Sequence, residues 1–109
     1  MIELNQKFVL HVPLYKCLDG ELVRIKIDDL LDDLIMELNQ GGFEDFYLTR
    51  AKAHYKKRCF DEVLLTIFSS SRSPEAIFEK WFKSNNDALG QEAFAWEMGN
   101  SLFIESLND

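Results

Sequence analysis

The 109-residue chain is poor in the residues that interrupt or cross-link a fold: two prolines, five glycines and two cysteines. With only Cys17 and Cys59 available, the chain has no disulfide scaffold. Glycine and proline are too few and too scattered to form a linker, so residues 1–109 are expected to fold as a single domain. No apolar run approaches the roughly 18 residues that a membrane-spanning helix needs, so no membrane partner is expected.

Sequence motifs that bind a cofactor or a metal are also absent. The chain has no phosphate loop, dinucleotide fingerprint, nucleophile elbow or zinc-protease motif. It has no pair of cysteines or histidines at the short spacing of zinc ligands, so neither a cofactor nor a metal is expected. The N-terminus lacks a basic stretch followed by an apolar one, which indicates a protein without a secretory signal and a cytoplasmic location.

Positive charge is scarce. Twelve basic residues face nineteen acidic ones, which gives a formal net charge of -7. Most of such a surface repels a phosphate backbone, and the glycine-aromatic pattern of RNA-recognition domains is missing, so no nucleic-acid partner is expected. Apolar residues, in contrast, make up 47% of the chain, enough for a core that needs no metal or disulfide.

Apolar and polar residues alternate in several segments, which predicts strands. Residues 7–15 and 22–27 are expected to form a hairpin, because Asp19-Gly20 between them is typical of a tight turn. Residues 43–53 and 60–68 are expected to form two more strands. In the second of these, Val63 to Phe68 is apolar on both faces, which indicates a central strand of the sheet.

Two segments have helical periodicity. The first begins near residue 28, where Asp28 or Asp29 is expected to cap it, and it ends at Gly41-Gly42. The second begins at Ser73-Pro74, a capping serine followed by a proline. On the inward stripe of this second helix Trp81 is expected to be buried.

The last segment has two interpretations. Residues 93–98 and 101–106 alternate around Gly99-Asn100, which favours a hairpin, but their good helix formers leave a terminal helix open. The apolar side chains here, Phe94, Trp96 and Met98, either complete the core or form a surface through which the chain associates as a homo-oligomer.

The resulting order is strand-strand-helix-strand-strand-helix-strand-strand. Without its first and last strands this is the split β-α-β-β-α-β plan, so the predicted fold is α+β: a ferredoxin-like antiparallel sheet with two helices on one face. That plan hosts enzymes, sensors and interaction modules, so it says little about function.

Residues 50–58 hold five positive charges and a histidine without one acid. This basic segment predicts a site for an anionic ligand or an acidic protein partner, although a solvated strand edge has the same composition. A second anion site is conceivable at the serine-rich start of the second helix. The candidate residues are Arg50, Lys52, His54, Lys56, Lys57, Arg58 and Arg72.

Two functions follow from these observations. The first is a small cytoplasmic binding domain, homo-oligomeric and without catalytic machinery, in which no catalytic residue is assigned. The second is a small enzyme whose pocket lies between sheet and helices and uses His11 or His54 with a carboxylate or Tyr55. A histidine inside a deep pocket would favour the enzyme.

Overall fold

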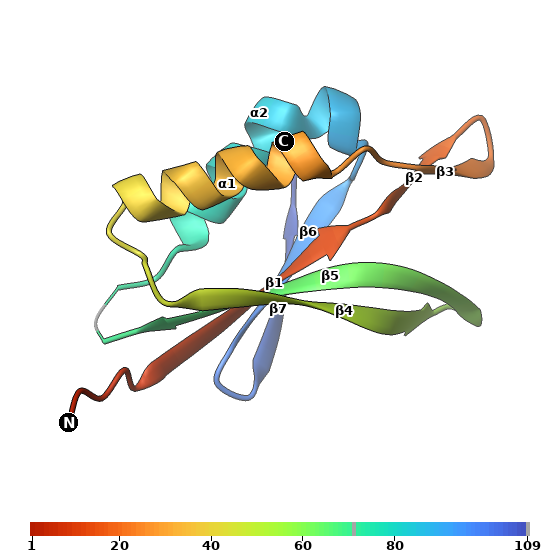
Figure 1. Cartoon of the computed structure of the whole chain (residues 1–109). Helices are drawn as coiled ribbons and strands as arrows, with labels where there is room; N and C mark the ends of the chain where they lie inside the picture. Colours follow the sequence, from red (N-terminus) through yellow and green to blue (C-terminus); the bar gives the residue numbers. More distant parts are fainter. Residues whose placement is uncertain (71, 109) are drawn as a thin grey trace.

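The computed structural model describes residues 1–70 and 72–108. Within these residues, two helices and seven strands follow one another (Figure 1). In order they are β1 (Gln6–Pro13), β2 (Tyr15–Leu18), β3 (Glu21–Arg24), α1 (Asp28–Gln40), β4 (Phe46–Tyr55), β5 (Arg58–Ser69), α2 (Glu75–Leu89), β6 (Ala93–Met98) and β7 (Ser101–Ser106).

Five of these strands form one antiparallel sheet in the order β4-β5-β1-β6-β7. The expected α+β class, with an antiparallel sheet and two helices, is therefore confirmed. β5 is an interior strand, as the apolar run from Val63 to Phe68 predicts, because it pairs with β4 on one side and β1 on the other. The middle strand, however, is β1.

The predicted hairpin between residues 7–15 and 22–27 is wrong. β2 and β3 pair with each other in a separate two-stranded sheet, joined at Asp19-Gly20, where both residues have positive φ as the sequence predicts. β1 is not available to β3 because β5 and β6 occupy its two edges. The apolar residues after β3, Ile25 and Ile27, are instead buried in the core.

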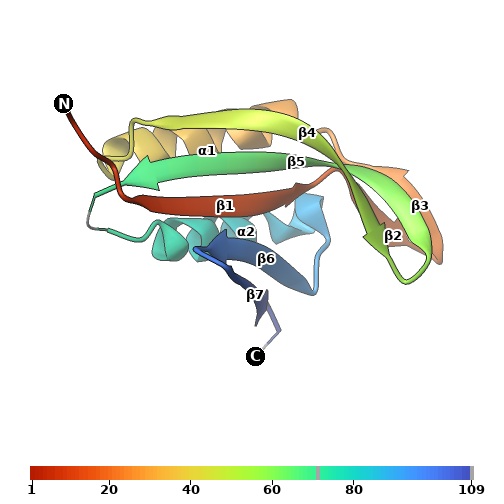
Figure 2. The ribbon, with the colours of Figure 1, turned by 90° about the horizontal axis from the view of Figure 1, so that it is seen from below.

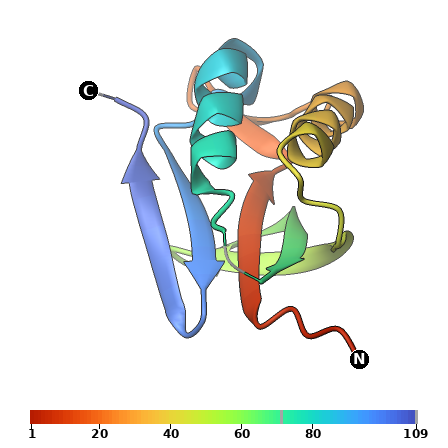
Figure 3. The same cartoon turned by 90° about the vertical axis from the view of Figure 1, so that its left-hand side faces the viewer.

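Both helices lie on the same side of the sheet (Figure 3). The helical stripes pack onto the sheet face that carries Phe8, Leu10 and Val12, and all three are fully buried. In α1 the expected aspartate cap is absent, because the helix begins at Asp28 and that side chain makes no capping hydrogen bond. In α2, Trp81 is buried as predicted.

The terminal segment is a hairpin rather than a helix. β6 and β7 turn at Gly99-Asn100, where Gly99 has a φ of +59°. Phe94 and Trp96 belong to the core, and the Trp96 ring stacks on Phe103 with 4.7 Å between centroids. Phe94 and Trp96 thus complete the core, whereas Met98 and Phe103 stay 41% and 36% exposed.

The opposite face of the sheet has no helix over it (Figure 3). Neither helix of the described residues is long and apolar enough to cross a lipid bilayer. Strand alternation places His11, whose neighbours in the chain point into the core, on this helix-free face.

Candidate functional site

β1 and β6 lie side by side over only part of their length. β1 pairs with β6 from Phe8 to Leu10, whereas its pairing with β5 continues to Pro13. Beyond Leu10, β6 turns away from β1 (Figure 2). A cleft of about 810 Å³ lies here, and it is lined by residues of β1, β5 and β6. This volume lies within the range of small-molecule sites, which hold a few polar groups against apolar walls.

The walls of the cleft come from distant parts of the chain. His11 and Pro13 line it from β1, Ala93 and Ala95 from β6, and Phe82 from α2. The two alanines take little space, and the aromatic ring supplies apolar surface. The cleft therefore has room for a flat, largely apolar ligand between its walls.

The loop from α2 to β6 is held in place by Gln91. Its Nε2 donates hydrogen bonds to the backbone oxygens of Tyr15 and Leu89, at 3.0 and 2.7 Å, and its backbone N–H donates to Asn86 Oδ1 at 2.9 Å. These bonds tie the loop to the start of β2. The end of the cleft nearest the two-stranded sheet is thus fixed by hydrogen bonds.

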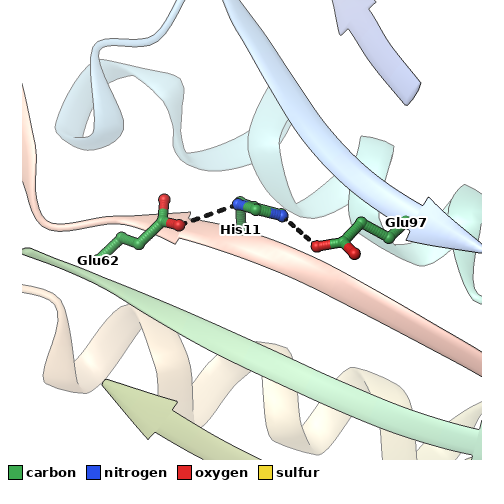
Figure 4. A network of polar contacts seen from close by, with 3 residues as sticks. All are labelled: His11, Glu62 and Glu97. Atoms are coloured by element: carbon green, nitrogen blue, oxygen red, sulfur yellow. Dashed lines mark hydrogen bonds and ion pairs between the residues drawn. The ribbon is translucent and has the colours of Figure 1, made fainter. Parts of the chain in front are cut away.

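At the edge of the cleft, His11 is held between two carboxylates (Figure 4). Its Nδ1 donates to Glu62 Oε1 at 3.0 Å, and its Nε2 donates to Glu97 Oε2 at 2.6 Å. Register explains the arrangement. Glu62, on β5, lies opposite Pro13 of β1, and Glu97, on β6, lies opposite Val9 of β1. Both carboxylates therefore share the helix-free face with His11 and approach it diagonally.

This network determines the charge of the imidazole. The hydrogen bond to Glu62 raises the pKa of His11 above its ordinary value of 6.5, and the bond to Glu97 and the charges of both carboxylates add to this, while burial opposes it. Because carboxylates only accept hydrogen bonds, the protonated imidazolium is the form that makes both contacts at once, and the raised pKa favours this form. In this form the three side chains together carry one net negative charge at the edge of the cleft.

The basic segment predicted from the sequence is divided by strand alternation. Arg50, Lys52 and His54 lie opposite residues of β5 on the sheet face that carries the helices. Lys52 Nζ forms an ion pair with Asp61 Oδ1 at 2.9 Å, and that hydrogen bond lowers the pKa of the Asp61 carboxyl. These three residues do not line the cleft.

The turn between β4 and β5 has a different place. Tyr55, Lys56 and Arg58 line the cleft, but Lys57, the other residue of the turn, does not. Lys56 Nζ lies 5.3 Å from the centre of the Tyr55 ring, a cation-π distance. Two of the seven predicted anion-binding residues, Lys56 and Arg58, thus belong to the cleft.

The Arg72 side chain makes contacts within the fold. Its guanidinium donates to the backbone oxygen of Gly41 and lies 4.9 Å from the centre of the Phe43 ring. Gly42 adjoins the same group, and a Cβ at this position would collide with the Arg72 guanidinium. The arginine therefore joins the end of α1 to the loop before α2, which accounts for it without a ligand. Its predicted binding of an anion stays a prediction.

Sequence reasoning missed Glu62 and Glu97 as partners of a histidine. Alternation along β5 and β6 assigns each a face, but only the pairing of both strands with β1 brings the faces together. The residues that the structure describes hold no cluster of three or more histidine, cysteine or acidic side chains arranged to bind a metal.

The comparison with known proteins bears on the fold. No known protein family and no curated protein matches the chain. Among solved structures, a phage SAM lyase in complex with S-methyl-5′-thioadenosine matches with a TM-score of 0.63 and 15% identity, over 93% of this chain and 88% of that one. A phage SAM lyase in the apo state matches with a TM-score of 0.60 and 16% identity, over 100% of this chain and 97% of that one. The chain shares the fold of an enzyme.

This finding corrects the functional expectation. The expectation of a binding domain without catalytic machinery is contradicted by this comparison, because the two solved structures named above are of lyases. The alternative, a small enzyme with a histidine at its pocket, agrees better with the fold and with the position of His11. His54, the other histidine considered, lies outside the cleft.

Proposed function

We propose that this chain is a lyase that cleaves S-adenosylmethionine in the cleft between β1 and β6. The observation that carries the proposal is the pair of carboxylates held around His11 at the edge of that cleft. The substrate is a permanent sulfonium cation attached to a flat nucleoside. A net negative group attracts the sulfonium, and the cleft of about 810 Å³, with apolar wall residues such as Phe82, has room for the nucleoside.

Cleavage to S-methyl-5′-thioadenosine breaks the bond between the sulfonium and the four-carbon chain. The sulfur takes the electron pair and leaves as a neutral thioether, while positive charge develops on the carbon that it leaves. A carboxylate facing that carbon stabilises this charge. Glu62 fits the role: it lines the cleft, one oxygen accepts from His11, and its second oxygen has no partner among the described residues.

His11 acts here as a positioning residue. Both of its N–H groups donate hydrogen bonds to carboxylates. His11 therefore fixes the orientation of Glu62 and is not available as a base. A route without a base agrees with this arrangement: an oxygen of the substrate's own carboxylate attacks the carbon that sulfur leaves and closes a lactone. No proton is transferred and no water is added.

The test is to incubate the purified chain with S-adenosylmethionine and to separate the products by chromatography with mass spectrometry. We expect S-methyl-5′-thioadenosine together with a lactone. Glu62→Gln should lose at least a hundredfold in kcat, in line with the removal of one electrostatic stabiliser. Glu44→Gln, which removes the same charge from an exposed loop, is the matched control. A folded wild-type chain that releases no thioether contradicts the proposal.

Three finer expectations from the sequence accompany this proposal. The split β-α-β-β-α-β order of β1, α1, β4, β5, α2 and β6 supports a ferredoxin-like arrangement extended by β7. The cytoplasmic location stays a prediction, and so does the homo-oligomer.

A further inference from the structure

We infer that Arg58 and Lys56 bind the carboxylate of the ligand, so that the cleft selects a molecule that carries both a cationic centre and a carboxylate. The inference rests on the proposed function and extends it from the nucleoside to the amino-acid end of the substrate. It assigns a specificity role to the turn between β4 and β5.

β5 arranges the charges in a row. Arg58, Phe60 and Glu62 alternate along the strand, so their side chains project from the same face, and all three line the cleft. Four residues of extended chain separate the Cα atoms of Arg58 and Glu62 by about 13 Å. The long side chains of Arg58 and Glu62 shorten this separation, so a carboxylate bound by Arg58 can still reach the carbon that Glu62 faces. An anionic end, an apolar middle and a cationic end thus follow one another along one wall.

The neighbouring strand β4 carries small side chains beside part of this row. Ala53 lies opposite Phe60 and Ala51 lies opposite Glu62, whereas Tyr55 lies opposite Arg58. The two methyl side chains do not cover the phenylalanine or the glutamate, both of which remain only partly buried. The row is therefore accessible to a ligand.

The cations of the turn have no carboxylate of their own. Among the residues that the structure describes, no acid forms an ion pair with Lys56 or Arg58, whereas Lys52 two pleats away is paired with Asp61. The chain has a net charge of -7, so most of its surface repels a carboxylate. Two unpaired cations that line the cleft offer it a favourable electrostatic interaction. Arginine offers it two parallel N–H groups.

The turn between β4 and β5 contains two lysines in similar backbone conformations. Lys56 and Lys57 both have positive φ, 48° and 65°, in a two-residue turn that favours asparagine and glycine. Both lysines bear this conformational cost, but only Lys56 lines the cleft. The pair supplies a matched test, because asparagine at either position removes one charge and eases the same backbone.

The experiment compares three ligands: S-adenosylmethionine, decarboxylated S-adenosylmethionine and S-methyl-5′-thioadenosine. KM is measured for the first, and the affinities for the other two by calorimetry. In Arg58→Gln we expect KM for S-adenosylmethionine to rise about ten- to a hundredfold, the range for a charge-assisted hydrogen bond. The affinities for the two ligands without a carboxylate should change less than twofold. Lys56→Asn should follow Arg58→Gln in direction, and Lys57→Asn should match the wild type.

The outcomes separate this inference from the proposed function. A wild type that converts S-adenosylmethionine, with an unchanged KM in Arg58→Gln, overturns the carboxylate site and leaves the lyase in place. Equal weakening of all three ligands in Arg58→Gln also overturns the site, because the variant then acts through the fold. A folded wild type that neither binds nor converts any of the three ligands overturns both. If Lys57→Asn weakens S-adenosylmethionine as much as Lys56→Asn, the effect is one of overall charge, and the site is refuted.

Discussion

Trp81 is the residue on which the packing of the two helices against the sheet is best tested. Its side chain is 1% exposed, its ring meets Phe82 edge-on with centroids 5.0 Å apart, and its Nε1 donates to the backbone oxygen of Leu30 in α1 at 2.8 Å. It therefore fills the core from α2 and also joins α2 to α1. Trp81→Ala removes both contributions at once.

The expected loss is about 3–5 kcal/mol, the range for truncating a buried tryptophan to alanine. Domains of this size have about 5–15 kcal/mol of stability in total. A loss of 3 kcal/mol corresponds to a fall in Tm of at least about 12 °C at the usual 4–8 °C for each kcal/mol. The variant should thus be strongly destabilised and in part unfolded at room temperature if the wild type is of low stability.

The assay is urea unfolding followed by circular dichroism, because the substitution removes one of the two tryptophans and compromises fluorescence as a probe. Trp81→Phe is the control: it keeps most of the ring and loses the N–H, so it should cost about 1–2 kcal/mol. A loss below about 1 kcal/mol in Trp81→Ala would place the side chain on the surface and refute the phase of α2.

Two further predictions concern charge and association. The folded-state pKa of His11 lies above its unfolded value of 6.5, so the stability that its protonated form contributes is complete below pH 6.5 and is lost as pH rises through the folded pKa. NMR titration should find a lower pKa for His11 in Glu97→Gln, and an unchanged value there would contradict the role of this bond. Leu102 and Ile104 are 56% and 71% exposed on the helix-free face, so we expect a homo-oligomer in sedimentation and a smaller species when both residues become glutamate. A wild type that sediments as a monomer would refute this.

Local patterns predicted most of the elements. The alternation of residues 93–98 and 101–106 around Gly99-Asn100 matches the observed hairpin, because period and turn chemistry are both encoded within a few residues. The pairing of β1 was not predictable in the same way. Neighbouring strands were expected to pair, but β1 pairs with β5 and β6, which lie far along the chain, and this depends on the packing of the whole core.

The site illustrates the same limit. His11 was considered from the sequence, but its two partners lie 51 and 86 residues away, so no spacing motif could connect them. By composition alone, residues 50–58 form one cluster of positive charge. Pairing with β5 places these residues on two faces of the sheet, with Lys52 next to Asp61 and Arg58 at the cleft. Counting charges along the chain does not reveal which residue lies on which face.

β5 links the stability of the fold to both proposals. Further along the strand, Leu65 and Ile67 are fully buried and fix its register against β1. The same register sets the face of Glu62 and Arg58, because side chains alternate with a period of two. A slip of one residue would move both charges to the helix-bearing face and would expose the buried pair. The core thus resists the displacement that would destroy the site, and the charged half of the strand is positioned by its apolar half.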